Sequence, residues 1–266
     1  MISAQQLPRI GRTAMAIDFG RYKKEPKQSV RTTDVKENEA LAQIKAAWVK
    51  FTWNENNSYE NSPERIMLIA SKLIKNLDYT AKDVENFSMV LTQFQEEKRF
   101  SKKGGLFLSA LINNGKDTDY VIHTKSGIRI NELGFQNTKN ITVEGDIGDF
   151  IGLCMKSGRI IVKGNAGGWT GRVMYGGLLV IIGNTEEWAG TDMFGGTLIV
   201  KGNTKGFLGS DIENGKIVIE GNVQGLVGCN MKGGEIHLEG EYGELGPKRF
   251  GGKIFHQGVL IAEKNR

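Results

Sequence analysis

The chain has little of what disulfide-rich, fibrous and membrane-spanning proteins are built from. Only two cysteines, Cys154 and Cys229, occur in 266 residues, so neither a disulfide framework nor a zinc-ribbon spacing is present. With four prolines, the sequence is neither collagen-like nor proline-rich. It contains no run of 18 or more apolar residues, and its beginning lacks the continuous apolar stretch of a signal peptide. We therefore expect a cytoplasmic protein that does not span a membrane.

Excess positive charge is confined to the first half of the chain. The formal net charge is +5; residues 1–126 carry 20 Lys and Arg against 15 Asp and Glu, whereas residues 127–266 carry 15 of each. Basic residues near the start are Arg9, Arg12, Arg21, Lys23, Lys24, Lys27 and Arg31. Such a stretch can contact nucleic acid or an acidic partner, but it is more often a solvated tail. We interpret residues 1–31 as a basic, partly disordered tail and expect no nucleic-acid binding.

Glycine, by contrast, is abundant and periodic. Of the 36 glycines, 29 lie in residues 141–266, where units such as IIVKGNAGGWTGRVMYGGL repeat every 19 residues. Each unit has the form Gly-x6-Gly-x5-Gly, and the repeated positions are Gly145, Gly152, Gly158, Gly164, Gly171, Gly177, Gly183, Gly190, Gly196, Gly202, Gly209, Gly215, Gly221, Gly228 and Gly234. A degenerate unit precedes them, and an altered unit with Gly240 follows. This period is too short for helical-hairpin or propeller-blade repeats.

The repeat predicts a parallel β-helix. Each unit opens with alternating apolar residues, as at Ile160 and Val162, which indicates a short strand. Three glycines then allow three tight bends, which close one coil. Six to seven coils, stacked at about 4.8 Å each, form a prism roughly 30 Å long. Leucine-rich repeats and calcium-binding nonapeptide rolls are excluded because their signatures are absent. We assign residues 119–266 to the β-helix.

Side chains recur at the same period and predict columns along the stack. Asparagines form one such ladder at Asn165, Asn184, Asn203 and Asn222. Apolar columns are expected at Phe150, Trp169, Trp188, Phe207, Leu226 and Leu245, and at Met155, Met174, Met193, Ile212 and Met231. Glu144, Lys163, Lys201 and Glu220 form an outward charged column. We interpret the aromatic and methionine columns as core or packing faces rather than a cofactor site.

The region before the repeat has helical patterns. Asp34 and Glu37 resemble a capping box before an apolar stripe, and Ser62-Pro63 reads as a helix start. Thr80 and Asp83 mark a third helix, and residues 104–125 indicate a last helix and a lead-in strand. We assign residues 32–118 to a small helical N-terminal domain that covers the open start of the β-helix.

Signals for catalysis are poor. Ser210 lies at a repeat corner outside any Gly-x-Ser-x-Gly elbow, and His237 lies on a predicted strand. Cys154 and Cys229 are about four coils apart, near 19 Å, which is too far for a disulfide. The glycines are followed by strands rather than helices, which argues against phosphate binding. We expect no catalytic residue, no cofactor and no metal, although stray Ser, His and Asp leave a self-contained hydrolase as a remote alternative.

The units EGDIGDFIG, MKSGRIIVKGNAGGWTG and GGLLVIIGN resemble the glycine-repeat family over about residues 127–253. This family comprises the C-terminal domain of the large chain of glutamate synthase and the glycine-repeat subunit of formylmethanofuran dehydrogenase, which also serves in a bacterial formyltransferase/hydrolase complex. The resemblance implies a right-handed parallel β-helix without catalytic residues of its own. It also implies a position between catalytic domains or subunits.

The sequence departs from that family in two ways. It has no N-terminal glutaminase cysteine, FMN barrel or iron–sulfur cysteine cluster, and its helical first half differs from the pattern of the dehydrogenase subunit. We expect a non-catalytic scaffold that binds protein partners or forms a homo-oligomer. The alternative is a subunit of a multi-enzyme complex, either of one-carbon metabolism or of a split glutamate synthase.

Overall fold

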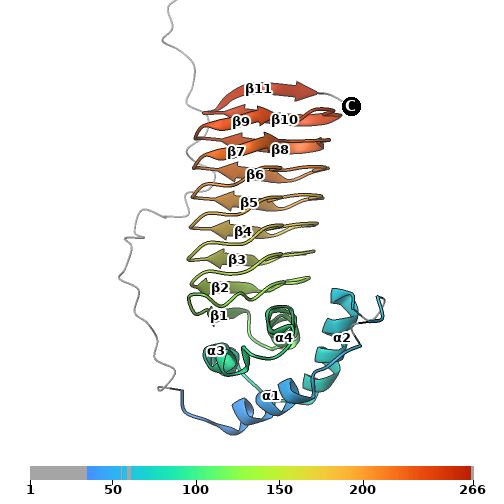
Figure 1. Cartoon of the computed structure of the whole chain (residues 1–266), viewed down its shortest axis with the longest axis vertical. Coiled ribbons are helices and arrows are strands. Elements are labelled where there is room, and N and C mark those ends of the chain that lie inside the picture. The colour runs from blue at the N-terminus through green and yellow to red at the C-terminus, as the bar shows by residue number, and fades with distance from the viewer. Residues whose placement is uncertain (1–34, 55, 59–60, 265–266) are drawn as a thin grey trace, which may run out of the picture. The chain divides into compact units, whose positions relative to one another are not determined.

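The protein is described by a computed structural model, which covers residues 35–54, 56–58 and 61–264. The basic tail expected at residues 1–31 lies outside these residues. Within them the chain is mainly β, with four α-helices followed by a stack of about seven parallel coils (Figure 1). Among the described residues, none of the helices combines the length and hydropathy needed to cross a bilayer. The sequence-based prediction of a parallel β-helix with a small helical part is confirmed.

The helices form what we call the helical cap. It comprises α1 (Glu39–Lys50), α2 (Pro63–Ile74), α3 (Ala81–Val90), the 3-10 helix η3 (Leu91–Phe94) and α4 (Phe100–Asn114). Ser62 caps α2 with Pro63 in its first turn, and Thr80 and Asp83 form a capping box on α3, as the sequence predicts. The predicted start of α1 is wrong. Asn38 is the N-cap, and its side-chain oxygen accepts a hydrogen bond from the backbone N–H of Leu41. The first residue of α1 is therefore Glu39, and Asp34 is not its N-cap.

Aromatic side chains fill the interior of the helical cap. Trp48 of α1 lies within 5.4 Å of Phe107 and 5.9 Å of Phe87, ring centroid to centroid, and all three rings are fully buried. The buried Lys103 ammonium lies 4.2 Å from the Trp48 ring centroid and 2.7 Å from the Glu97 carboxylate. Glu97 also accepts from the Trp48 indole at 2.9 Å, so the buried charge is paired.

The coils stack in register. Their principal sheet has the order β1-β2-β3-β4-β5-β6-β8-β10-β11, and β7 pairs with β9 in a second sheet. The strands are β1 (Asp119–His123), β2 (Asn140–Glu144), β3 (Arg159–Val162), β4 (Leu178–Ile181), β5 (Thr197–Val200), β6 (Lys216–Ile219), β7 (Val223–Val227), β8 (Lys232–Leu238), β9 (Tyr242–Leu245), β10 (Gly251–His256) and β11 (Val259–Lys264). Arg159 pairs with Leu178, and Leu178 with Thr197, so neighbours are 19 residues apart. The sequence period is therefore the register of the sheet.

The three glycine columns exist for two different reasons. Glycines of the second and third columns, such as Gly152 and Gly215, have φ between +61° and +99°, which side-chain-bearing residues resist. At Gly164, and at its equivalents Gly183, Gly202, Gly221 and Gly240, φ is not left-handed. There a Cβ would collide with the carbonyl oxygen of the glycine one coil earlier. Gly145, with φ of +124°, is the exception in the first column. That column otherwise preserves close stacking and the other two make the bends, so the prediction that all three glycines of a unit make bends is wrong for the first column.

The two predicted apolar columns have different places. Met155, Met174, Met193, Ile212 and Met231 are fully buried inside the coils. The aromatic column lies outside and is half-buried, with Trp169 and Trp188 stacked at 4.9 Å and Trp188 and Phe207 at 4.2 Å. The placement of Leu245 in this column is wrong. A register shift pairs Leu245 with Val227 and Glu244 with Leu226, because the last unit is one residue shorter there.

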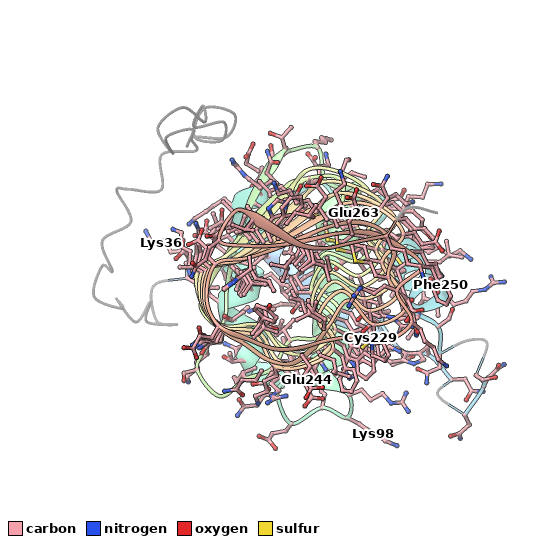
Figure 2. The ribbon with its side chains drawn as sticks, turned by 90° about the horizontal axis from the view of Figure 1, so that it is seen from above. Lys36, Lys98, Cys229, Glu244, Phe250 and Glu263 are labelled. Atoms are coloured by element: carbon pink, nitrogen blue, oxygen red, sulfur yellow. The ribbon has the colours of Figure 1, made fainter. Side chains whose placement is uncertain are left out.

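The coil stack and the helical cap share a core. One cluster of buried apolar residues runs from Leu41 in α1 to Ile254 in β10. In Figure 1 the cap lies at the β1 end of the stack and β11 at the other. At the β11 end the chain reverses direction, and β11 pairs antiparallel with β10. Viewed along the stack in Figure 2, the coils superpose and polar side chains project around them.

Candidate functional site

A hollow of about 580 Å³ opens on the surface of the last coils. It is lined by four glycines that stand one above another in the third glycine column, together with charged side chains. The glycines are Gly196, Gly215, Gly234 and Gly252, and the charged residues are Glu213, Lys216, Lys232, Glu235, Lys253 and Lys264. Because successive glycines carry no side chain, the surface is recessed between the columns on either side. We call this hollow the glycine groove.

Exposed aromatic residues occupy the column beside the groove. Tyr175 and Phe194 are 54% and 42% exposed and stack at 5.3 Å with an angle of 8° between their planes. Phe250, 53% exposed, occupies the equivalent place in the last coil (Figure 2). The amides of Tyr175, Phe194 and Phe250 donate to the carbonyls of Met155, Met174 and Met231, which shows that the three places are equivalent. We call these three residues the aromatic ridge.

Ion pairs order much of the charge in the groove. The Lys232 ammonium lies 3.0 Å from Glu213, and Lys253 lies 3.5 Å from Glu263. The hydrogen bond to Glu213 raises the pKa of Lys232 above its ordinary value. A hydrogen bond from His237 at 2.9 Å lowers the pKa of Glu235, aided by the nearby charges of Lys216 and Lys253. With Glu263 counted as the partner of Lys253, four lysines face three glutamates, which leaves the groove with a small excess of positive charge near neutral pH.

Each of the three histidines has a partner of its own. His123 contacts Glu85 at 3.1 Å, His256 contacts the Gly240 carbonyl at 3.1 Å, and His237 contacts Glu235. His237 also stacks on Phe255 with centroids 4.5 Å apart, and it lies on β8, as predicted for a strand residue. The described part of the chain holds no group of three or more His, Cys, Asp or Glu that could bind a metal ion.

Among the candidate nucleophiles, Ser210 and Cys229 lie in neighbouring coils, 19 residues apart, and a hydrogen bond joins their side chains. Ser210 is 1% exposed, and its hydroxyl donates to the Phe207 carbonyl at 3.3 Å. Both cysteines are free thiols. Burial raises the pKa of the Cys154 thiol, and burial also raises that of Cys229. A raised thiol pKa disfavours the nucleophilic thiolate. Within the described residues, no hydrogen bond or ion pair joins Ser210 or either cysteine to a histidine.

The asparagine ladder is present, with a backbone contribution that the sequence did not indicate. The backbone N–H of Asn184 donates to the side-chain oxygen of Asn165 at 2.9 Å, and the backbone N–H of Asn203 donates to that of Asn184 at 2.8 Å. Asn222 continues the ladder, and its own side chain accepts from the Glu241 amide at 2.9 Å. Each asparagine therefore satisfies a backbone N–H of the next coil. The charged column is also paired, with Lys163 at 2.6 Å from Glu144 and Lys201 bonded to Glu220.

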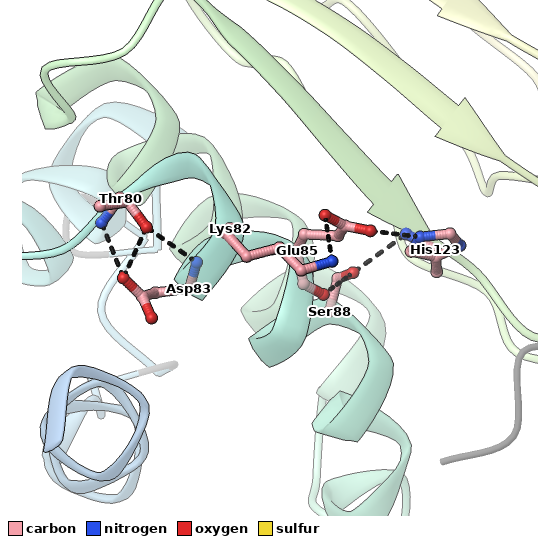
Figure 3. A network of polar contacts seen from close by, with 6 residues as sticks. All are labelled: Thr80, Lys82, Asp83, Glu85, Ser88 and His123. Atoms are coloured by element: carbon pink, nitrogen blue, oxygen red, sulfur yellow. Dashed lines mark hydrogen bonds and ion pairs between the residues drawn. The ribbon is translucent and has the colours of Figure 1, made fainter. Parts of the chain in front are cut away.

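A polar network joins the helical cap to the first coil (Figure 3). The Ser88 hydroxyl of α3 donates to the Glu85 carbonyl at 2.6 Å and accepts from the backbone N–H of His123 at 3.0 Å. Glu85 bonds both His123 and Lys82, the latter at 2.9 Å. Burial alone would raise the pKa of Glu85, but these bonds and charges outweigh burial and lower it. The edge N–H of β1 is thus satisfied by the cap.

Sequence reasoning missed the ridge and the serines of the cap. Tyr175 and Phe194 each follow a methionine of the buried column and precede a Gly-Gly pair, a signal shared by only two neighbouring units. Ser88 and Ser109 lie within helices. The apolar run LFLSALI around Ser109 indicates burial, but nothing in either local pattern identifies the partner of the hydroxyl. Both serines are almost fully buried, at 2% and 1% exposure.

No family model matches the chain, and a search of curated proteins finds no significant match.

Proposed function

We propose that this protein is a non-catalytic scaffold that binds protein partners along the side of its coil stack. The aromatic ridge is the observation that carries this proposal. Tyr175 and Phe194 expose about half of their rings to solvent beside the glycine groove. Aromatic side chains flanked by polar groups are the residues that contribute most to protein–protein binding. A partner that covered both rings would bury this apolar surface.

The ridge is also rigid, which favours binding. The two rings stack on each other, and their backbones are held by hydrogen bonds to the coil on one side. Little side-chain entropy is then lost when a partner binds, because the rings are already ordered. In the described residues, no hydrogen bond joins Ser210 or either cysteine to a histidine, which supports a binding role over hydrolysis, since a nucleophile needs an adjacent base.

The proposal is tested with the full chain as bait in extract of its native host. A Tyr175→Ser/Phe194→Ser variant should lose a partner that the wild type retains in fixed stoichiometry, as measured by mass spectrometry. A Val49→Ser/Leu68→Ser variant is the matched control, because these exposed side chains lie on the helical cap at 65% and 44% exposure. Retention of the partner by the ridge variant, or the absence of any stoichiometric partner, would contradict the proposal.

A second candidate is a non-catalytic subunit of a multi-enzyme complex of one-carbon metabolism or of a split glutamate synthase. The observation that favours it is the glycine repeat that resembles that family, because all three glycine columns have structural roles here. The same purification distinguishes the two. Partners with formyltransferase, metallohydrolase, amidotransferase or FMN-dependent activity would favour the second candidate.

A further inference from the structure

The end of the coil stack opposite the helical cap presents free strand edges. β11 is the last strand of the principal sheet, and β9 is the last strand of the second. Within the described residues, no strand pairs with the outer edge of either one. Such an edge offers unpaired backbone N–H and C=O groups to another chain, and natural proteins usually cover or charge it.

The first four residues of β11 are apolar, and their side chains alternate between the two faces of the strand. Val259 is 65% exposed and Leu260 is 43% exposed, whereas charge enters only at Glu263 and Lys264. These two charges cancel, so that the strand has no net charge. β11 thus lacks the excess of like charge that would repel a second copy of itself.

The other end of the stack cannot serve as the partner for β11. The backbone N–H of His123 on β1 is already bonded to Ser88 of α3, and the helical cap packs on this strand. Head-to-tail addition of copies, which would produce an open filament, is therefore blocked. An edge that associates only with its own equivalent gives a closed, two-fold dimer.

We propose that two copies of this chain associate tail to tail by antiparallel pairing of β11 with β11, which continues the principal sheet across the dimer. A register centred between Ile261 and Ala262 places Leu260 opposite Glu263 and Val259 opposite Lys264 of the other copy. The methylene stem of the lysine then covers Val259. A register centred on Glu263 would place two carboxylates opposite each other and is disfavoured. The dimer uses the end of the stack and leaves the aromatic ridge on its side.

Light scattering on the full chain, over a dilution series, tests this proposal. The wild type should show twice the 29.3 kDa of one chain. A Val259→Lys/Leu260→Lys variant should show a twofold lower mass, because the lysine introduced at position 259 lies opposite Lys264 of the other copy and both substitutions remove the apolar contact. Val49→Lys/Leu68→Lys is the matched control, since these side chains have nearly the same exposures, 65% and 44%, on the helical cap. This control should remain dimeric.

Small-angle scattering then fixes the geometry. A tail-to-tail dimer has close to twice the maximum dimension of the monomeric Val259→Lys/Leu260→Lys variant, whereas a side-by-side dimer does not. A monomeric wild type, a higher polymer, a side-by-side dimer, or equal loss of association in both lysine variants would overturn the proposal. Circular dichroism of each variant verifies that the coils remain folded.

Discussion

The two ends of the coil stack face the same physical problem and differ in how they meet it. A terminal coil has backbone groups and apolar side chains with no neighbouring coil. At the β1 end, four helices with their own aromatic core cover it, whereas at the β11 end the described residues provide only one antiparallel strand. The first end is closed within the chain, and the second remains available.

The helical cap closes its end by replacing the hydrogen bonds of a missing coil. Inside the stack, the Gly152 amide donates to the Leu133 carbonyl one coil earlier, at 2.9 Å. The equivalent amide in the first coil belongs to Gly134, and it donates to the Ser109 hydroxyl of α4 at 2.9 Å. Gly105 allows this close approach, because a Cβ there would collide with the Asn131 backbone. Capping a solenoid therefore requires matched polar groups as well as apolar cover.

The largest expected loss of unfolding free energy comes from truncating a buried apolar side chain at each end of the stack. Phe107→Ala removes a fully buried ring that contacts Trp48, Phe51 and Phe87, which should cost about 3–5 kcal/mol of unfolding free energy. Ile254→Ala makes a comparable truncation in the last coil, where this residue is 1% exposed.

Hydrogen exchange distinguishes the two consequences. In a stack of coils each unit contacts only its neighbours, so loss at a free end should fray that end alone. Ile254→Ala should accelerate exchange in β9–β11, whereas Phe107→Ala should accelerate it throughout the helical cap and β1. Equal acceleration along the whole stack in both variants would show that the ends do not differ in this way.

A smaller effect is expected from Ser109, whose hydroxyl takes the place of the carbonyl acceptor of a preceding coil. Ser109→Ala leaves the buried amides of Gly134 and Phe135 without their acceptor and should cost about 1–3 kcal/mol. Ser101→Ala is the matched control on the same helix, because Ser101 contributes its backbone carbonyl to Asn131. Denaturant unfolding of both variants measures the difference. If the two alanine variants were equally stable, the hydroxyl would have no role in closing the stack.

The same contrast explains what the sequence could predict. The coils follow from glycine spacing, because backbone conformation and close stacking impose glycine in every coil and repetition makes the signal unmistakable. Helix starts at Ser62 and Thr80 follow from local capping chemistry. Helix capping depends on residues a few positions apart, and the glycine spacing recurs in every coil. Both patterns can therefore be recognised in a single sequence.

What escaped prediction depends on contacts that occur once. Ser109 meets Gly134 across 25 residues and Ser88 meets His123 across 35, and no local pattern marks either contact. The register shift at Leu245 follows from one missing residue in the last unit. The aromatic ridge occupies too few coils to repeat.

The smallest effect should come from acid, and it should act at the capped end. The pKa of Glu85 is lower in the folded protein than its ordinary value of 4.5, so its contribution to stability is complete above that value and is lost as the pH falls through the lowered pKa. The Asp83 carboxyl, whose pKa is also lowered, loses stability in the same direction. Glu85→Gln should therefore cost about 1 kcal/mol or less near neutral pH and become indistinguishable from wild type in acid.

Hydrogen exchange of β1 and α3, measured for both proteins from neutral to acidic pH, determines this difference. The protection factors of amides at the Glu85–His123 junction, which are corrected for the intrinsic pH dependence of exchange, should fall with acid in the wild type, while those of β11 should change little. A difference between wild type and Glu85→Gln that persists at the lowest pH would mean that the side chain acts through packing rather than charge. A matching acid response at β11 would mean that the two ends of the stack are coupled, which the nearest-neighbour character of the coils does not allow.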